Sequence, residues 1–253
     1  MTATVSLLGC YSHAAIPAGG PEAVALRRVY SPPLTTGVVV PLYVHPGKVW
    51  NDAIRAKIAH PYVPFVIIVN VDNGPGTSAD ATYASFIQKA QMAGIDVLGY
   101  VHTKYAKRSA TAVDADISRW EALYRTDGVF LDQMATNAQS YYQAATAYAH
   151  AHSLWFVLGN AGVDAPASLG PDVINYYERA GYPKLKFLRK PVHLSYGSAK
   201  WSYIAGAVPF NPAKIKATAR YVGYLYATNG KEPQCYCRLP SYFDSLVALL
   251  DTH

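Results

Sequence analysis

The chain has 253 residues, of which 51% are hydrophobic and 15% are charged, and its formal net charge is +6. This length suits one α/β barrel of roughly 250 residues, and the apolar content excludes extensive disorder. Its apolar runs stay well short of the ~18 residues that a membrane-spanning helix needs, so we expect no membrane span. The cations are spread thinly and no nucleic-acid-binding motif accompanies them, so we expect no nucleic-acid partner.

The first part of the chain shows no strong hydrophobic periodicity. We expect residues 1–36 to form an irregular N-terminal arm before a single domain over residues 37–253. The odd number of cysteines argues against a disulfide framework, and a bridge from Cys10 to Cys235 or Cys237 stays open. Neither zinc-ligand spacing nor a dinucleotide-binding glycine motif is present, so we expect no metal and no cofactor.

After this arm, short apolar runs alternate with helical patterns. The runs are continuous, which is typical of parallel strands buried on both faces. We predict strands over residues 38–44, 65–70, 97–102, 128–132, 155–160, 173–178, 192–196 and 221–227. We predict helices over residues 51–59, 80–93, 112–124, 138–152, 212–218 and 242–250. This order predicts a (β/α)8 barrel with short connections around the sixth and seventh strands, and a doubly wound open sheet is the alternative.

Polar and aromatic side chains gather at the ends of the predicted strands. In a parallel barrel the carboxyl ends of the strands carry the chemistry. The candidates for shaping a substrate site are Tyr43, Asn70, Tyr100, His102, Gln133, Asn160, Tyr176, His193 and Tyr226. Tyrosine, with 21 residues in the chain, offers a flat apolar face and a hydrogen-bonding edge, which suits sugar rings.

Two carboxylates, Asp132 and Glu178, end the predicted fourth and sixth strands. Strand alternation places Phe130 on the face of Asp132, and Tyr176 on the face of Glu178. Paired carboxylates that flank one bond are the machinery of glycoside hydrolysis. The alternative is that both are buried hydrogen-bond partners of neighbouring tyrosines.

Several motifs, taken in order, resemble the spherulin-4-like family, which is related to glycoside hydrolase families 135 and 114. The motifs are Val40-Pro41-Leu42-Tyr43-Val44, Trp50, Pro64-Phe65-Val66-Ile67-Ile68-Val69-Asn70, Asn73-Gly74-Pro75-Gly76, Gly99-Tyr100-Val101-His102-Thr103-Lys104-Tyr105 and Asp127-Gly128-Val129-Phe130-Leu131-Asp132. They cover roughly residues 38–135, and a weaker match continues to about residue 245.

The resemblance implies a secreted or cell-surface barrel enzyme that cuts α-1,4-linked galactosamine or N-acetylgalactosamine exopolysaccharide within the chain. It implies that Asp132 and Glu178 are the catalytic pair. We expect a retaining mechanism with Asp132 as nucleophile and Glu178 as acid/base. The polysaccharide is the expected partner, and we expect a monomer.

The chain departs from this family beside its first carboxylate. Members often have Asp-Glu where this chain has Asp132-Gln133, and Gln cannot hold or give a proton as Glu does. This favours a non-catalytic glycan-binding barrel as the alternative. A metal-dependent deacetylase barrel is a third hypothesis, and it requires activity that is lost to chelators.

Overall fold

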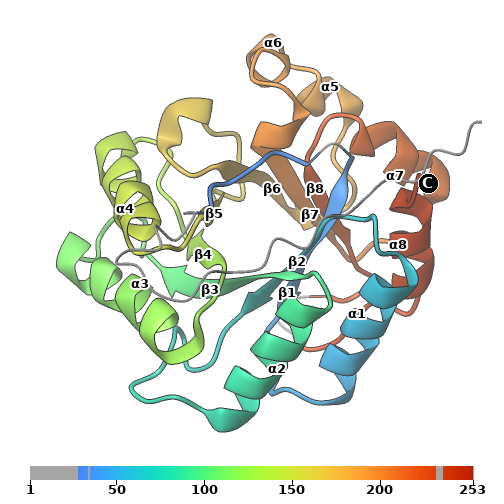
Figure 1. The fold of residues 1–253 in the computed structure, drawn as a ribbon. Coiled ribbons are helices and arrows are strands. Elements are labelled where there is room, and N and C mark those ends of the chain that lie inside the picture. Colours follow the sequence, from blue (N-terminus) through green and yellow to red (C-terminus); the bar gives the residue numbers. More distant parts are fainter. Residues whose placement is uncertain (1–27, 34, 232–235, 253) are drawn as a thin grey trace, which may run out of the picture.

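The computed structural model describes residues 28–33, 35–231 and 236–252, and their eight strands form one closed parallel barrel (Figure 1). The strands follow one another in chain order, and β8 pairs with β1 to close the barrel. They are β1 (Gly37–Leu42), β2 (Phe65–Val69), β3 (Asp96–His102), β4 (Gly128–Asp132), β5 (Phe156–Asn160), β6 (Val173–Ala180), β7 (Trp201–Gly206) and β8 (Tyr224–Ala227). The predicted (β/α)8 barrel is therefore confirmed, and the open sheet is wrong.

Helices surround the barrel and alternate with its strands (Figure 1). The longer ones are α1 (Lys48–Ala59), α2 (Ala81–Met92), α3 (Ala110–Tyr124), α4 (Gln139–Ala151), α7 (Pro212–Ala219) and α8 (Phe243–Leu250). The connections that follow β5 and β6 hold short helical turns instead: η1 (Ala167–Leu169), α5 (Leu185–Leu188), α6 (Pro191–Leu194) and η2 (Ser198–Lys200). The barrel is thus trimmed around its sixth and seventh strands, as the sequence predicted.

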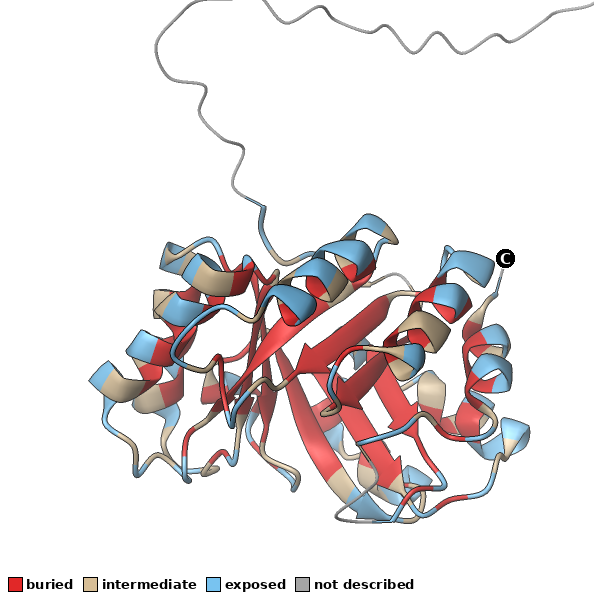
Figure 2. Ribbon diagram, turned by 90° about the horizontal axis from the view of Figure 1, so that it is seen from below, coloured by how far each residue is buried: buried red, intermediate tan, exposed pale blue. Residues whose placement is uncertain are grey.

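The strands are buried on both faces, which explains their continuous apolar sequences. All of β2 is buried, and Val38, Val39 and Val40 of β1 have no exposed surface. Figure 2 shows buried strands at the centre and helices that are buried mainly on the side facing them. Burial of one such Val side chain contributes about 1.5–3 kcal/mol, so the strands form a firm frame for the polar residues at their ends.

Local signals set the helix ends. The carboxylate of Asp80 caps α2 and accepts hydrogen bonds from the backbone N–H groups of Thr82 (2.8 Å) and Tyr83 (3.0 Å). Gly94, with φ of 83°, follows the end of this helix and turns the chain toward β3.

Close contact between β4 and β5 depends on Gly128. A Cβ atom at this position would lie 1.7 Å from the carbonyl oxygen of Phe156, so any side chain here would force the strands apart. Asp132 and Asn160 end these two strands.

The strand predicted over residues 192–196 is wrong. Residues 191–194 form the short helix α6, and the seventh strand is Trp201–Gly206. Pro191 stands at the first turn of α6, where its missing N–H costs nothing. A short apolar run does not distinguish a strand from a helical turn, and Pro191 is compatible with the helical turn. Each of the other predicted runs contains a strand.

Some predictions fall outside the described residues, namely Cys10 and residues 1–27 of the expected arm, together with Cys235. The described part of the arm, residues 28–33 and 35–36, contains no helix or strand. Cys237 is exposed, and its Sγ lies 3.9 Å from the carbonyl oxygen of Tyr43. Within the described residues, no helix is long and apolar enough to span a membrane.

Candidate active site

The side chains of Asp132, Asn160 and Glu178 meet at the carboxyl ends of β4, β5 and β6. The Nδ2 atom of Asn160 donates hydrogen bonds to Oδ1 of Asp132 (2.8 Å) and to Oε2 of Glu178. Because one nitrogen serves both carboxylates, those two oxygens lie within two hydrogen-bond lengths of each other, about 6 Å or less. The two predicted catalytic residues are therefore neighbours.

A buried chain of hydrogen bonds orients the bridging amide. Nδ2 of Asn175 donates to Oδ1 of Asn160 at 2.8 Å, and Oγ of Ser202 donates to Oδ1 of Asn175 at 3.3 Å. Asn175 and Ser202 have no exposed surface. Since the Oδ1 atom of Asn160 already accepts from Asn175, its NH2 group is directed at the carboxylates, which only accept.

An irregularity in β6 brings Glu178 to this site. Asn175 pairs with Ser202 and Tyr177 pairs with Tyr203, so Tyr176 is an extra residue in the strand. In a regular strand Asn175 and Glu178 would lie on opposite faces, because side chains alternate. The extra residue shifts the alternation, and both side chains reach Asn160.

The same irregularity turns Tyr176 away from the site. Its ring stacks on Trp201 at 4.8 Å between centroids and lies 5.0 Å from the ring of Phe187. The prediction that Tyr176 and Glu178 share a face is therefore wrong. Strict alternation holds only in a strand without an extra residue.

Tyr100 holds the second oxygen of Asp132. Its hydroxyl donates to Oδ2 at 2.8 Å. Burial first, and the negative charge of Asp132 second, raise the pKa of the Tyr100 hydroxyl well above its ordinary value. The hydroxyl therefore stays protonated and remains a donor. Each oxygen of Asp132 thus accepts one hydrogen bond from a side chain of a neighbouring strand.

Tyr236 holds the second oxygen of Glu178, and sequence reasoning missed it. Its hydroxyl donates to Oε1 of Glu178. Its backbone oxygen accepts from the N–H of Tyr43 at 2.9 Å, and the two rings lie 5.4 Å apart between centroids. Tyr236 follows β8 in a segment without hydrophobic periodicity. Its position between Cys235 and Cys237 is the one signal in the sequence that draws attention to it.

A cavity of about 400 Å3 opens over these side chains, and we call it the Asp132 cavity. Its lining includes Tyr43, Asp132, Gln133, Asn160 and Glu178 of the predicted residues, and also Tyr105, Ile204 and Tyr236. Its volume is typical of ligand pockets, which span about 300–1,000 Å3. Gln133 is exposed, and its φ of 54° ends β4 directly beside Asp132.

The other predicted site residues do not line the Asp132 cavity. Oδ1 of Asn70 accepts from the N–H of Gly74 at 2.9 Å, and Tyr226 is fully buried. His102 pairs in register with Asp132, and burial and the nearby Arg108 lower the pKa of its imidazole.

His193 lies on α6 rather than on a strand. It is 2% exposed, and its Nε2 lies 2.7 Å from Oδ1 of Asp164. Its ring packs against Tyr176 and Trp201, so both His193 and Tyr176 belong to the outer layer beside β6. In the part of the chain that the structure describes, no three His, Cys, Asp or Glu side chains form a group that could hold a metal ion.

Comparison with solved structures finds other proteins with the same fold. Sph3 from Aspergillus clavatus, solved in complex with GalNAc, matches 89% of this chain and 100% of its own at 22% identity, with a TM-score of 0.72. An alpha-amylase from Geobacillus thermoleovorans, complexed with acarbose, matches 86% of this chain and 77% of its own at 10% identity, with a TM-score of 0.55. At these identities both likenesses show the fold alone.

Comparison of sequences shows the family. Spherulin-4 from Physarum polycephalum is 36% identical over 118 residues, which span 46% of this chain and 35% of that protein. The model of the family described as spherulation-specific family 4 matches residues 37–250, which is the whole barrel from β1 to α8. The chain therefore belongs to spherulation-specific family 4, which confirms the resemblance of its strand motifs to spherulin-4-like proteins.

Proposed function

We propose that this protein is a glycoside hydrolase that cuts within a galactosamine- or N-acetylgalactosamine-containing exopolysaccharide, at α-1,4 linkages and with retention. One observation carries the proposal: Asp132 and Glu178 accept from the same amide nitrogen of Asn160. The choice of sugar rests on the resemblance to the family and on the GalNAc bound to the Aspergillus clavatus protein. An extracellular site of action, which the resemblance implies, is part of the same proposal.

The distance between the carboxylates supports retention. Retaining glycosidases hold their two carboxyl groups about 5–5.5 Å apart, whereas inverting enzymes leave about 6.5–9.5 Å for a water molecule. The shared amide nitrogen holds the facing oxygens within about 6 Å, and a pair this close is nearer to the retaining arrangement. In this mechanism a carboxylate oxygen of Asp132 attacks the anomeric carbon while Glu178 protonates the departing oxygen. Glu178 then takes a proton from water, whose oxygen displaces Asp132 from the anomeric carbon.

The hydrogen bonds favour Asp132 as the nucleophile. Both of its oxygens accept from donors on the neighbouring strands, Tyr100 and Asn160, which stabilise the anion and fix its direction. Glu178 has a different partner in Tyr236, which follows β8 rather than ending a strand. A hydroxyl can donate to a carboxylate or accept from a carboxylic acid, so Tyr236 serves Glu178 in both of its protonation states.

A glycan-binding barrel without turnover is the second candidate, and Gln133 favours it. This residue lines the Asp132 cavity beside Asp132, and its amide cannot transfer a proton. Both candidates place a sugar against Tyr43 and Tyr236, and they differ only in whether a bond breaks.

A reducing-end assay separates the candidates. The protein is incubated with galactosamine polymers of graded acetylation, and the products are counted and sized by mass spectrometry. A hydrolase releases internal fragments, and Asp132→Asn or Glu178→Gln abolishes the release while circular dichroism shows an intact fold. Polymer binding with no release of reducing ends would establish the binding barrel instead.

A further inference from the structure

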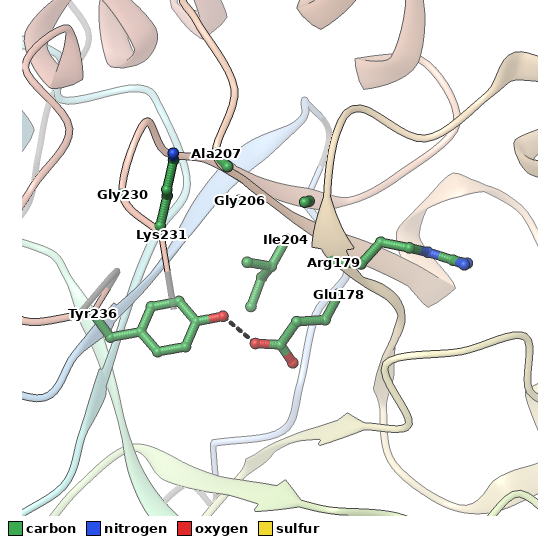
Figure 3. Close-up of a pocket in the computed structure, with 9 residues that line it drawn as sticks. Glu178, Arg179, Ile204, Gly206, Ala207, Gly230, Lys231 and Tyr236 are labelled. Carbon is green, nitrogen blue, oxygen red and sulfur yellow. Dashed lines mark hydrogen bonds between the residues drawn. The ribbon is translucent and has the colours of Figure 1, made fainter. Parts of the chain in front are cut away.

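A second hollow, of about 360 Å3, adjoins the Asp132 cavity on the other side of Glu178. We call it the Gly206 hollow. Ala180, Gly206, Ala207, Gly230 and Lys231 line it. Figure 3 shows the hydroxyl of Tyr236 bonded to Glu178, with Ile204 beside this pair and the glycines and Lys231 beyond it.

Three residues are shared between the two hollows: Glu178, Ile204 and Tyr236. Asp132, by contrast, lines only the Asp132 cavity. The bonded pair of Glu178 and Tyr236 therefore stands at the border between two spaces, and Asp132 lies wholly on one side of it.

This asymmetry matches what each carboxylate must do in retaining hydrolysis, and so the inference rests on the proposed function. The nucleophile contacts only the sugar whose anomeric carbon is attacked. The acid/base must reach the oxygen that joins this sugar to the next one, and it therefore stands between the two sugar positions. Asp132 has the first placement and Glu178 has the second.

We propose that the Gly206 hollow binds the sugar on the leaving-group side of the cleaved bond. The sugar that is attacked lies in the Asp132 cavity. The polysaccharide then crosses the barrel mouth in one direction, with its non-reducing end over β4 and β5 and its reducing end over β7, Gly230 and Lys231. Tyr105 is 59% exposed and lines the Asp132 cavity but not the Gly206 hollow, so it lies on the non-reducing side.

The walls of the Gly206 hollow leave room for a pyranose ring. Four of its lining residues are small, namely Ala180, Gly206, Ala207 and Gly230. Arg179 turns its guanidinium away, 4.5 Å from the ring centre of Tyr177 (Figure 3). A Cβ atom on Gly206 would meet nothing closer than 3.9 Å. Larger side chains can therefore be placed here to fill the hollow without displacing the backbone.

Two filling variants test the assignment, Gly206→Val on β7 and Ala180→Trp on β6. Each is assayed on the galactosamine polymer and on a glycosyl fluoride, whose small leaving group needs no sugar in the hollow. We expect polymer cleavage to fall by at least about tenfold, while hydrolysis of the fluoride stays within about twofold of wild type. Ala147→Trp on the exposed face of α4 is the matched control and leaves both rates unchanged.

The fluoride also reports on the catalytic pair, because its hydrolysis still requires Asp132 and Glu178. Equal loss of both activities in both variants would overturn the assignment, since it would place the filled space on the attacked side. Unchanged polymer cleavage in both variants would overturn it too. If wild-type protein cleaves neither substrate, the proposed function itself fails, and that result is distinct from both of these.

Discussion

Asp132 and Glu178 are tied together by one amide nitrogen, Nδ2 of Asn160, although they end strands that are not neighbours in the barrel. Two negative charges this close repel each other, and the shared donor offsets part of that repulsion. Asn160 ends the strand between theirs, and buried Asn175 fixes its orientation. The spacing of the carboxylates is thus a property of the barrel frame and does not depend on a bound sugar.

Removal of this donor tests its contribution. We expect Asn160→Ala to lower kcat by about 100- to 1,000-fold, the usual effect of losing one preorganised donor in an active site. The measurement is kcat on the acetylated galactosamine polymer. Asn211→Ala is the control, because Asn211 caps α7 through its bond to the N–H of Lys214 and lines neither cavity. It costs about 1 kcal/mol of stability and leaves kcat unchanged. Equal kcat values for the two variants would contradict the role of Asn160.

Azide rescue distinguishes the two carboxylates. In Glu178→Ala, azide replaces water and attacks the glycosyl-enzyme, so the Asp132–carbon bond breaks and an α-glycosyl azide forms. In Asp132→Ala, azide attacks the substrate directly while Glu178 protonates the departing oxygen, which gives the β-glycosyl azide. Product configuration is read by NMR on a substrate with an activated leaving group. The opposite pairing of variant and product would exchange the two roles.

Lys231 is expected to select the sugar in the Gly206 hollow by charge. Its ammonium repels the protonated amine of galactosamine and tolerates an acetamido group. After partial digestion of a mixed polymer, the leaving-side sugar becomes the new non-reducing end, which mass spectrometry identifies. We expect this end to be enriched in acetylated sugar, and Lys231→Glu to lower the enrichment by about threefold. Lys216→Glu on α7 makes the same charge change outside both cavities. Equal enrichment in all three proteins would contradict the charge effect.

Asp96, at the start of β3, makes the stability of the barrel depend on pH. Burial first, and the charge of Asp127 second, raise the pKa of its carboxyl to about 6 from an ordinary value of 3.8. The folded state therefore holds this proton more tightly than the unfolded state does. Its stabilising effect is complete below pH 4 and is lost as the pH rises through about 6.

Asp96→Asn removes this pH dependence. We expect the variant to be more stable than wild type at pH 8, by about 2 kcal/mol in the free energy of unfolding, and equal to it at pH 4. Urea unfolding at the two pH values measures the difference. Glu121→Gln, at an exposed position on α3, controls for the loss of a charge. A variant less stable than wild type at pH 8 would show that the contact of Asp96 with Arg28, at 3.4 Å, outweighs the effect of burial.

The barrel could be predicted because parallel strands buried on both faces leave a simple record in the sequence. Runs such as residues 65–69 are continuous, apolar and short. The predicted ends placed Asp132 and Asn160 correctly, and they placed Glu178 on β6, which continues to Ala180. The site depends on features that leave no such record. The extra residue Tyr176 in β6 is visible only in its pairing with β7, and without it the side chain of Glu178 would be assigned the wrong neighbours.

Two further features were beyond prediction for the same kind of reason. His193 follows Pro191 in an apolar run that fits a strand as well as a helical turn, so its place on α6 is settled by tertiary packing. Tyr236 reaches Glu178 from a segment that follows the last strand, and a long-range contact of this type has no sequence period.

The measurement that tests the central claim most directly is NMR of the acetylated galactosamine polymer during digestion. The proposal predicts that new reducing ends form from internal cuts, that they carry the α configuration before mutarotation, and that Asp132→Asn forms none. First-formed β ends would contradict retention by the Asp132–Glu178 pair. A polymer that binds the protein and gains no reducing ends would contradict the hydrolase itself.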